Sequence, residues 1–296
     1  MRKVGLIVNP YASGVDEQKL ALVAASLGRA AEVEIARTER PGHGAELAAQ
    51  LGVRVDALFS FSGDGGFNEV LNGLAADVPL GFVPGGAANV LPRALGLPRN
   101  AVRAAERLAE SLARGRTRRI SLGRVNGRRF AFAAGIGFDA ELIRRIEGKG
   151  RSPAGRRRGA VYALGAATRI LAERHGRIEP ALDVEGLGRA AFALVANTDP
   201  YTYLGPLPLH PCPAACFELG LDVAAPASVR PSSLPRFLAY ALTGRRRPPD
   251  VLGGHDLDRI EVVCDRPLPL QADGEDLGDV ERALFETERT AVTVYI

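Results

Sequence analysis

A regular alternation of short apolar runs and helical patterns in the first 120 residues constrains the fold more than any other feature of this chain. The first apolar run ends at Asn9-Pro10, a segment of helical spacing follows it, and the same order of patterns recurs along the segment. Strands joined by helices indicate a parallel sheet with helices on both faces, because parallel neighbours require a crossover connection. We therefore predict an α/β domain at residues 1–120. Its strands are expected at 4–8, 33–36, 57–61 and 80–83, and its helices at 16–27, 45–51, 67–74 and 101–113.

The pattern changes beyond residue 120, where most apolar runs predict short strands. Asn126-Gly127 lies between two such runs and is a strong hairpin signal, because both residues tolerate a positive φ. One long helix is expected at 156–174. We therefore predict a β-rich, antiparallel sandwich-like domain at residues 121–296. Its strands are expected at 118–125, 129–134, 181–184, 190–196, 217–223, 259–263, 268–272 and 291–296.

The composition excludes several classes of protein. The chain has 296 residues, of which 46% are hydrophobic and 24% charged, so it is neither disordered nor fibrous. Three cysteines are too few for a disulfide scaffold and indicate a reducing compartment. The longest apolar stretch, 130–138, is far shorter than the ~20 residues that span a bilayer, and no signal peptide is visible. We therefore expect a cytoplasmic location.

A net charge of +4 is compatible with anionic membranes, nucleic acid or nucleotide phosphates, and selects none of them. The basic runs lack interleaved aromatic residues and no nucleic-acid-binding module is visible, so no nucleic-acid partner is expected. A homodimer formed by pairing of edge strands is left open by the sequence.

Three glycine-rich turns follow three of the predicted strands, at 9–14, 62–66 and 84–89. The carboxyl ends of parallel strands meet at one edge of the sheet, so these turns are expected to form a phosphate-binding rim. Asp64 could hold Mg²⁺ that bridges phosphate oxygens. The alternative is an ordinary set of βα turns rich in Gly and Asp. The chain contains no P-loop sequence, and the glycines at 135–137 follow a hairpin strand, which excludes them as a dinucleotide site.

Several of these motifs, in this order along the chain, resemble the diacylglycerol kinase catalytic-domain family, which includes bacterial lipid kinases and sphingosine kinases. The resemblance begins in the first two glycine turns, where Gly63-Asp64-Gly65 is continued by Asn68-Glu69-Val70. It continues to Asp273-Gly274-Glu275 and so spans nearly the whole chain. NAD kinases and phosphofructokinases share the Gly-Asp-Gly element alone. The further elements are Asn9-Pro10, Ser13-Gly14, Pro84, Gly86, Asn89, Gly135–Ala140 and Asn197.

The resemblance implies an ATP-dependent lipid kinase that uses Mg²⁺ and acts on a lipid hydroxyl, such as that of diacylglycerol, at a membrane surface. Asp273 would be the general base, with Glu275 beside it, and Asp64 would bind Mg²⁺ together with ATP. A base in the second domain and a nucleotide on the first would place the reaction in a cleft between domains. The implied nucleotide-binding residues are Asn9, Ser13, Gly14, Thr38, Gly63, Asp64, Gly65, Gly66, Asn68, Glu69, Gly85, Gly86, Ala87 and Asn89.

The chain departs from the family pattern at positions that bear on activity. The family usually has a threonine after Gly-Asp-Gly and another in the next glycine turn, where this chain has Gly66 and Ala87. A segment that binds a structural magnesium in the family retains only Glu218, so that site is not expected. Asp273-Gly274 also fits a plain hairpin turn. These departures leave two alternatives open: a silent member that binds nucleotide or lipid, and a soluble-substrate kinase of the NAD kinase type.

Overall fold

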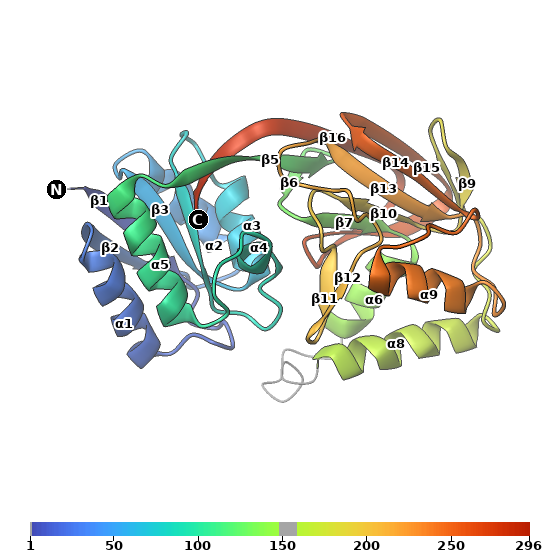
Figure 1. Cartoon of the computed structure of the whole chain (residues 1–296), viewed down its shortest axis with the longest axis horizontal. Helices are drawn as coiled ribbons and strands as arrows, with labels where there is room; N and C mark the ends of the chain where they lie inside the picture. The colour runs from blue at the N-terminus through green and yellow to red at the C-terminus, as the bar shows by residue number, and fades with distance from the viewer. Residues whose placement is uncertain (1, 148–158) are drawn as a thin grey trace. The chain divides into compact units, whose positions relative to one another are not determined.

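The computed structural model describes residues 2–147 and 159–296, which form two units (Figure 1). The first unit comprises Met1–Ser121 together with Thr290–Ile296, and the second comprises Leu122–Arg289. The last residues of the chain therefore return to the first unit. None of the helices in the described part of the chain is both long and apolar enough to span a membrane.

The first unit is built on a parallel sheet, as its alternating strands and helices predict. The strands lie in the order β4-β3-β1-β2, and the end of β16 joins next to β4, where Val294 pairs in parallel with Leu80. Every residue of β3 and β4 is buried, as expected for strands of a parallel sheet that is covered on both faces. These strands are β1 (Lys3–Val8), β2 (Glu32–Arg37), β3 (Ala57–Ser62) and β4 (Leu80–Pro84).

Helices pack in pairs on this sheet, α1 against α5 and α2 against α3 (Figure 1). Aromatic rings fill the space under α3, where Phe67 meets Phe82 edge-on with ring centroids 5.2 Å apart. Asp16 caps α1 by accepting a hydrogen bond from the Lys19 N–H at 2.7 Å. The helices are α1 (Glu17–Gly28), α2 (His43–Gly52), α3 (Asp64–Asn72), α4 (Val90–Ala94) and α5 (Ala101–Arg114).

The second unit is a β-rich, antiparallel structure, which confirms the predicted fold class. Its strands lie in the order β14-β13-β10-β7-β15-β16, with β5 and β6 paired beyond β16 and β8 and β9 beyond β15. Its main hydrophobic cluster is mostly aliphatic and contains the fully buried rings of Phe130 and Phe285. Helices α6 and α8 pack on one another. The elements are β5 (Thr117–Val125), β6 (Arg128–Phe130), β7 (Ala133–Ile136), α6 (Phe138–Glu147), α8 (Gly159–Glu173), β8 (Leu182–Val184), β9 (Gly188–Ala190), β10 (Ala193–Ala196), β11 (Thr202–Leu204), β12 (Leu207–Leu209), β13 (Leu221–Pro226), α9 (Leu234–Thr243), β14 (Val251–Leu257), β15 (Arg259–Ala272) and β16 (Glu275–Tyr295).

Two tight turns in the second unit have the same backbone geometry. Asn126 and Gly127 have φ of 47° and 87°, and they join β5 to β6 as the hairpin signal predicts. Asp273 and Gly274 have φ of 50° and 80° and join β15 to β16. Both are two-residue turns with positive φ at each central position, which matches the twist of the flanking strands.

Several boundaries differ from those predicted by the sequence. The second unit ends at Arg289 rather than at residue 296, because the end of β16 pairs with β4. Runs predicted as separate strands at 259–263 and 268–272 form the single strand β15, and helices α6 and α9 were not predicted. Helix α3 begins at Asp64 rather than at residue 67, so the glycine turn is itself the first turn of the helix. The predicted start of α8 at residues 156–158 lies outside the described residues.

Candidate functional site

The three glycine turns of the first unit are joined by backbone hydrogen bonds. The Gly14 N–H donates to the Gly85 carbonyl at 2.7 Å, and the Gly85 N–H donates to the Ser62 carbonyl at 2.6 Å. A β-carbon on Gly14 would lie 2.9 Å from the Gly85 oxygen, so only glycine allows this approach. The structure thus brings the ends of β1, β3 and β4 together into one rim at the carboxyl edge of the parallel sheet.

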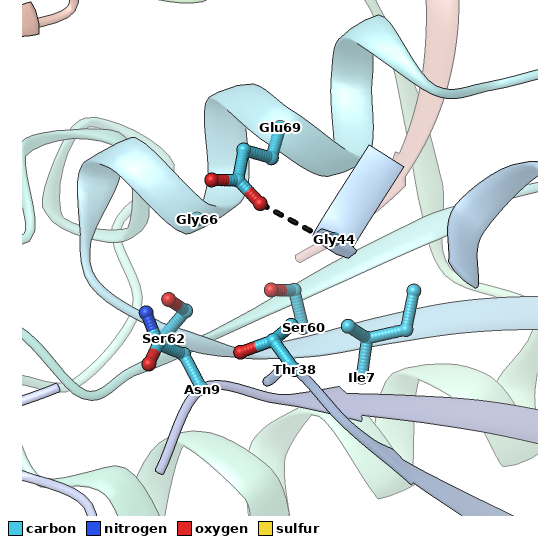
Figure 2. Close-up of a pocket in the computed structure, with 8 residues that line it drawn as sticks. All are labelled: Ile7, Asn9, Thr38, Gly44, Ser60, Ser62, Gly66 and Glu69. Carbon is cyan, nitrogen blue, oxygen red and sulfur yellow. Dashed lines mark hydrogen bonds between the residues drawn. The ribbon is translucent and has the colours of Figure 1, made fainter. Parts of the chain in front are cut away.

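A small pocket, with room for about one water molecule, lies beside this rim. It is far smaller than a typical ligand site, so it suits only one small polar group of a larger ligand. Figure 2 shows the side chains of Asn9 and Ser62 close together, with Thr38, Ser60 and Ile7 further along the strands. The residues that line the pocket are Ile7, Asn9, Thr38, Gly44, Ser60, Ser62, Gly66 and Glu69.

Two serines of this lining have buried hydroxyl groups that the fold does not use. Ser60 and Ser62 are each 2% exposed, and neither hydroxyl has a hydrogen-bond partner among the residues that the structure describes. A buried polar group without a partner costs about 1–3 kcal/mol, so such groups mark sites of binding or strain. The sequence motifs assign no role to either serine, although Ser62 is the first residue of the glycine turn at 62–66. The signal was present in the sequence, because serine alternates with phenylalanine at 59–62, which places both hydroxyls on one face of β3.

Glu69, expected among the phosphate-binding residues, binds the start of α2. Its carboxylate accepts hydrogen bonds from the Gly42 and Gly44 N–H groups, each at 2.9 Å. Gly42 is the N-cap of α2 and has no side chain, so the acceptor comes from α3 instead. Glu69 therefore forms one wall of the pocket and caps α2 at the same time.

The other predicted nucleotide-binding residues have three kinds of environment. Asp64 is partly exposed and its carboxylate accepts from the Leu91 N–H at 3.3 Å, which leaves it at the rim. Asn68 is 1% exposed and its side-chain oxygen accepts from the amide of Asn72, away from the pocket lining. Asn89 closes its own turn through two 2.7 Å hydrogen bonds with Gly86. Exposed positions on the rim are Ser13, Gly65 and Ala87, and the partly exposed ones include Gly14, Gly63 and Gly86.

The side chains at the rim can hold a magnesium ion only if phosphate oxygens supply further ligands. Within residues 2–147 and 159–296, no group of three or more His, Cys, Asp or Glu residues could hold a metal. Mg²⁺ commonly binds one or two carboxylates together with substrate phosphates and water, and a single carboxylate at a phosphate-binding rim fits that pattern. Asp64 is the residue that would hold it.

Asp273, expected as the general base, is bound tightly within the second unit. Its side chain is buried, and the carboxylate accepts hydrogen bonds from three consecutive N–H groups of residues 131–133, at 2.6, 3.0 and 3.2 Å. The Asp273 N–H donates to the Ala133 carbonyl at 2.7 Å. The side chain therefore joins its own hairpin turn to the connection between β6 and β7.

Arginines bind the remaining carboxylates of this hairpin. Arg128 contacts Glu275 at 2.5 Å. Arg144 of α6 donates to both oxygens of Asp276 at 2.6 and 2.9 Å and also pairs with Asp279. The Arg144 guanidinium lowers the pKa of Asp276 below its usual range. Glu275 thus lies beside Asp273 in the chain, as the motif requires, with its charge paired.

A buried polar cluster at Asp139 was not predicted as a site. Its carboxyl lies 2.7 Å from the Tyr201 hydroxyl and 2.6 Å from the Gln271 amide nitrogen, and burial raises its pKa above the ordinary value. The Tyr201 hydroxyl also lies 3.0 Å from the Ala134 carbonyl, yet it has a single proton to donate. A protonated Asp139 accounts for all of these contacts, because its own O–H then donates to Tyr201.

Solved structures of known proteins share this fold. A diacylglycerol kinase from Bacillus anthracis str. Sterne matches with a TM-score of 0.74 at 21% identity, covering 100% of this chain and 97% of that one. An NAD kinase from Archaeoglobus fulgidus, solved in complex with ATP, matches with a TM-score of 0.52 at 14% identity, covering 99% and 93%. The chain therefore has the two-unit fold found in both of these kinases.

Sequence comparison finds similarity to diacylglycerol kinases over part of the chain. Residues 3–125 match the model of the diacylglycerol kinase catalytic domain, the family that the motifs of the chain resemble. A diacylglycerol kinase from Bacillus subtilis (strain 168) is 33% identical over 155 residues, 50% of each chain. One from Staphylococcus saprophyticus is 35% identical over 137 residues, 44% of each chain. The chain thus matches about half the length of these curated relatives.

Proposed function

We propose that this protein is an ATP-dependent lipid kinase that transfers the γ-phosphoryl group of ATP to the hydroxyl of diacylglycerol or a related lipid. The observation that carries the proposal is the convergence of three glycine turns beside a pocket with two unpartnered hydroxyls, in a domain of the diacylglycerol kinase family. Phosphoryl transfer depends mainly on positioning and on neutralising charge, and glycine turns supply N–H groups for both.

In this proposal the first unit binds ATP. The exposed N–H groups at the start of α3 face the phosphates, because a helix N-terminus favours negative charge. Asp64 holds Mg²⁺, which would neutralise charge on the phosphate oxygens. Asn9 and Thr38 line the pocket and contact the rest of the nucleotide.

The second unit provides Asp273 as the general base for the lipid hydroxyl. The carboxylate already accepts three N–H groups, so this role requires it to exchange at least one of them for the lipid hydroxyl. The enzyme would meet its lipid at a membrane surface from the cytoplasmic side. Which lipid it accepts depends on an apolar site for the acyl chains.

A silent family member that binds nucleotide without transferring phosphate is the second candidate. The three hydrogen bonds to Asp273 favour it, since they give the carboxylate a complete structural role. The absence of hydroxyls at Gly66 and Ala87 favours it as well.

The test is incubation of the protein with γ-labelled ATP, Mg²⁺ and vesicles containing diacylglycerol or sphingoid bases, with NAD as a soluble acceptor in parallel. We expect label in a lipid, and we expect Asp273→Asn to abolish transfer while ATP affinity is retained. Thermal unfolding of that variant is measured beside activity, because an asparagine amide would face N–H donors and weaken the turn. ATP binding without transfer to any acceptor would support the silent member, and label in NAD alone would support the soluble-substrate kinase.

A further inference from the structure

The side chain of Ser62 fills the space that a side chain at position 66 would need. A β-carbon built on Gly66 would lie 2.0 Å from the Ser62 Oγ and 2.7 Å from the Ser62 Cβ. Real β-carbons do not approach other atoms this closely, and the contact with Cβ means that turning the hydroxyl away would not relieve it. Ser62 in this conformation and any larger residue at position 66 therefore exclude one another.

The Ser62 hydroxyl occupies the place from which a threonine at position 66 would act. Ser62 is the last residue of β3, and its carbonyl accepts the Gly85 N–H of the neighbouring glycine turn. Its side chain is 2% exposed and lines the pocket, where Figure 2 shows it below Gly66 and beside Asn9. The hydroxyl has no hydrogen-bond partner within the described residues, so its donor is available to a ligand.

We propose that Ser62 is a phosphate-binding residue of this chain, supplying from the end of β3 the hydroxyl that the family carries on the residue after Gly-Asp-Gly. This inference rests on the proposed function in taking the ligand to be the polyphosphate of a nucleoside triphosphate. Phosphate is the part of the ligand assigned to Ser62 because Gly63, the next residue, is the N-cap of α3, where N–H groups favour an anion.

The first experiment compares ATP affinity and thermal stability in Ser62→Ala. We expect the dissociation constant for ATP to rise at least about 10-fold, as for loss of a hydrogen bond to a charged group. We expect the melting temperature to stay the same or rise, because the lost hydroxyl has no partner in the fold. The matched control is Ser111→Ala. Ser111 is equally buried in the first unit but donates to the main-chain oxygen of Ile296, so its loss should lower the melting temperature and leave ATP affinity unchanged.

The second experiment exchanges the two residues. Gly66→Thr alone should lower the melting temperature and weaken ATP binding, because the new side chain collides with Ser62. The double variant Ser62→Gly with Gly66→Thr should recover both properties, to within about threefold of wild-type affinity. Two substitutions that each weaken ATP binding and together restore it would show that the residues share one place and one role.

The outcomes separate this inference from the proposed function. If the wild-type protein binds no ATP, both the proposed function and the role of Ser62 are wrong. Wild-type protein that binds ATP as tightly as Ser62→Ala does would overturn the role of Ser62 alone. Inorganic tripolyphosphate and adenosine serve as partial ligands, and Ser62→Ala should weaken binding of the first only. Weakened adenosine binding with unchanged tripolyphosphate binding would overturn the assignment to phosphate.

Discussion

At the scale of single residues, the protein buries polar groups in two different ways. Asp273 is buried with three N–H donors, whereas Ser60 and Ser62 are buried without partners. A satisfied carboxylate stabilises the turn that it closes, and unpartnered hydroxyls cost stability unless a ligand uses them. Asp273 thus has a visible structural role, whereas the fold gives the hydroxyls of Ser60 and Ser62 no hydrogen-bond partner within the described residues.

Asp139 adds a dependence of stability on pH. Burial raises its pKa in the folded protein, so the folded state retains the proton after the unfolded chain has lost it. The stability that the folded protein gains from this proton is complete below the unfolded pKa of about 3.9. It is lost as pH rises through the folded pKa. The side chain of the Asp139→Asn variant cannot ionise. The melting temperature of the variant relative to that of the wild type should therefore increase as pH rises from 4 to 8. Parallel curves for the two proteins across this range, by calorimetry, would contradict a buried protonated carboxyl.

At the scale of elements, the pocket depends on helices that are held by side chains from their neighbours. The N-cap of helix α2 is Gly42, which has no side chain to accept a hydrogen bond, and Glu69 of α3 provides the acceptor. The sequence predicts both helices from their own patterns. It could not predict this cap, because the acceptor lies 27 and 25 residues away from the two donors along the chain.

Removal of the Glu69 carboxylate should loosen the start of α2. We expect Glu69→Ala to lower the free energy of unfolding of the first unit by about 1 kcal/mol, as for loss of an N-cap. Amide hydrogen exchange at residues 42–46 should rise in the same variant. Glu110→Ala, an exposed glutamate on α5, is the control and should change stability by less than about 0.5 kcal/mol. Equal effects of the two substitutions would rule out the capping role.

At the scale of the whole molecule, two strands belong to both units. The division of the chain falls after Ser121 within β5 and after Arg289 within β16. The end of β16 is an integral strand of the first unit, since Val294 is fully buried and Tyr295 stacks on Phe59 with ring centroids 5.7 Å apart. The stability of the first unit therefore depends on the last residues of the chain.

A cavity at the end of β16 should weaken the first unit. We expect Val294→Ala to lower its free energy of unfolding by about 2 kcal/mol, from lost burial and the cavity that remains. Hydrogen exchange should rise in β3 and β4, with β10 and β13 of the second unit unchanged. The control is Val263→Ala on β15, where the side chain is 50% exposed. An unchanged exchange rate in β4 would show that the terminal strand is not part of that sheet's cooperative unit.

The sequence by itself determined the parallel sheet, the positions of the three glycine turns, the Asn126-Gly127 hairpin and the resemblance to the diacylglycerol kinase family. Each of these depends on residues that are close together in the chain: apolar periodicity, glycines that tolerate positive φ, and short motifs. Only the tertiary structure decided that Glu69 caps α2, that Asp273 binds the connection between β6 and β7, and that residues 290–296 complete the first sheet. These depend on contacts between distant segments, as does the collision that excludes a side chain at Gly66 while Ser62 keeps its place. Local patterns encode local conformation, whereas the partners of buried polar groups are set only when the chain packs.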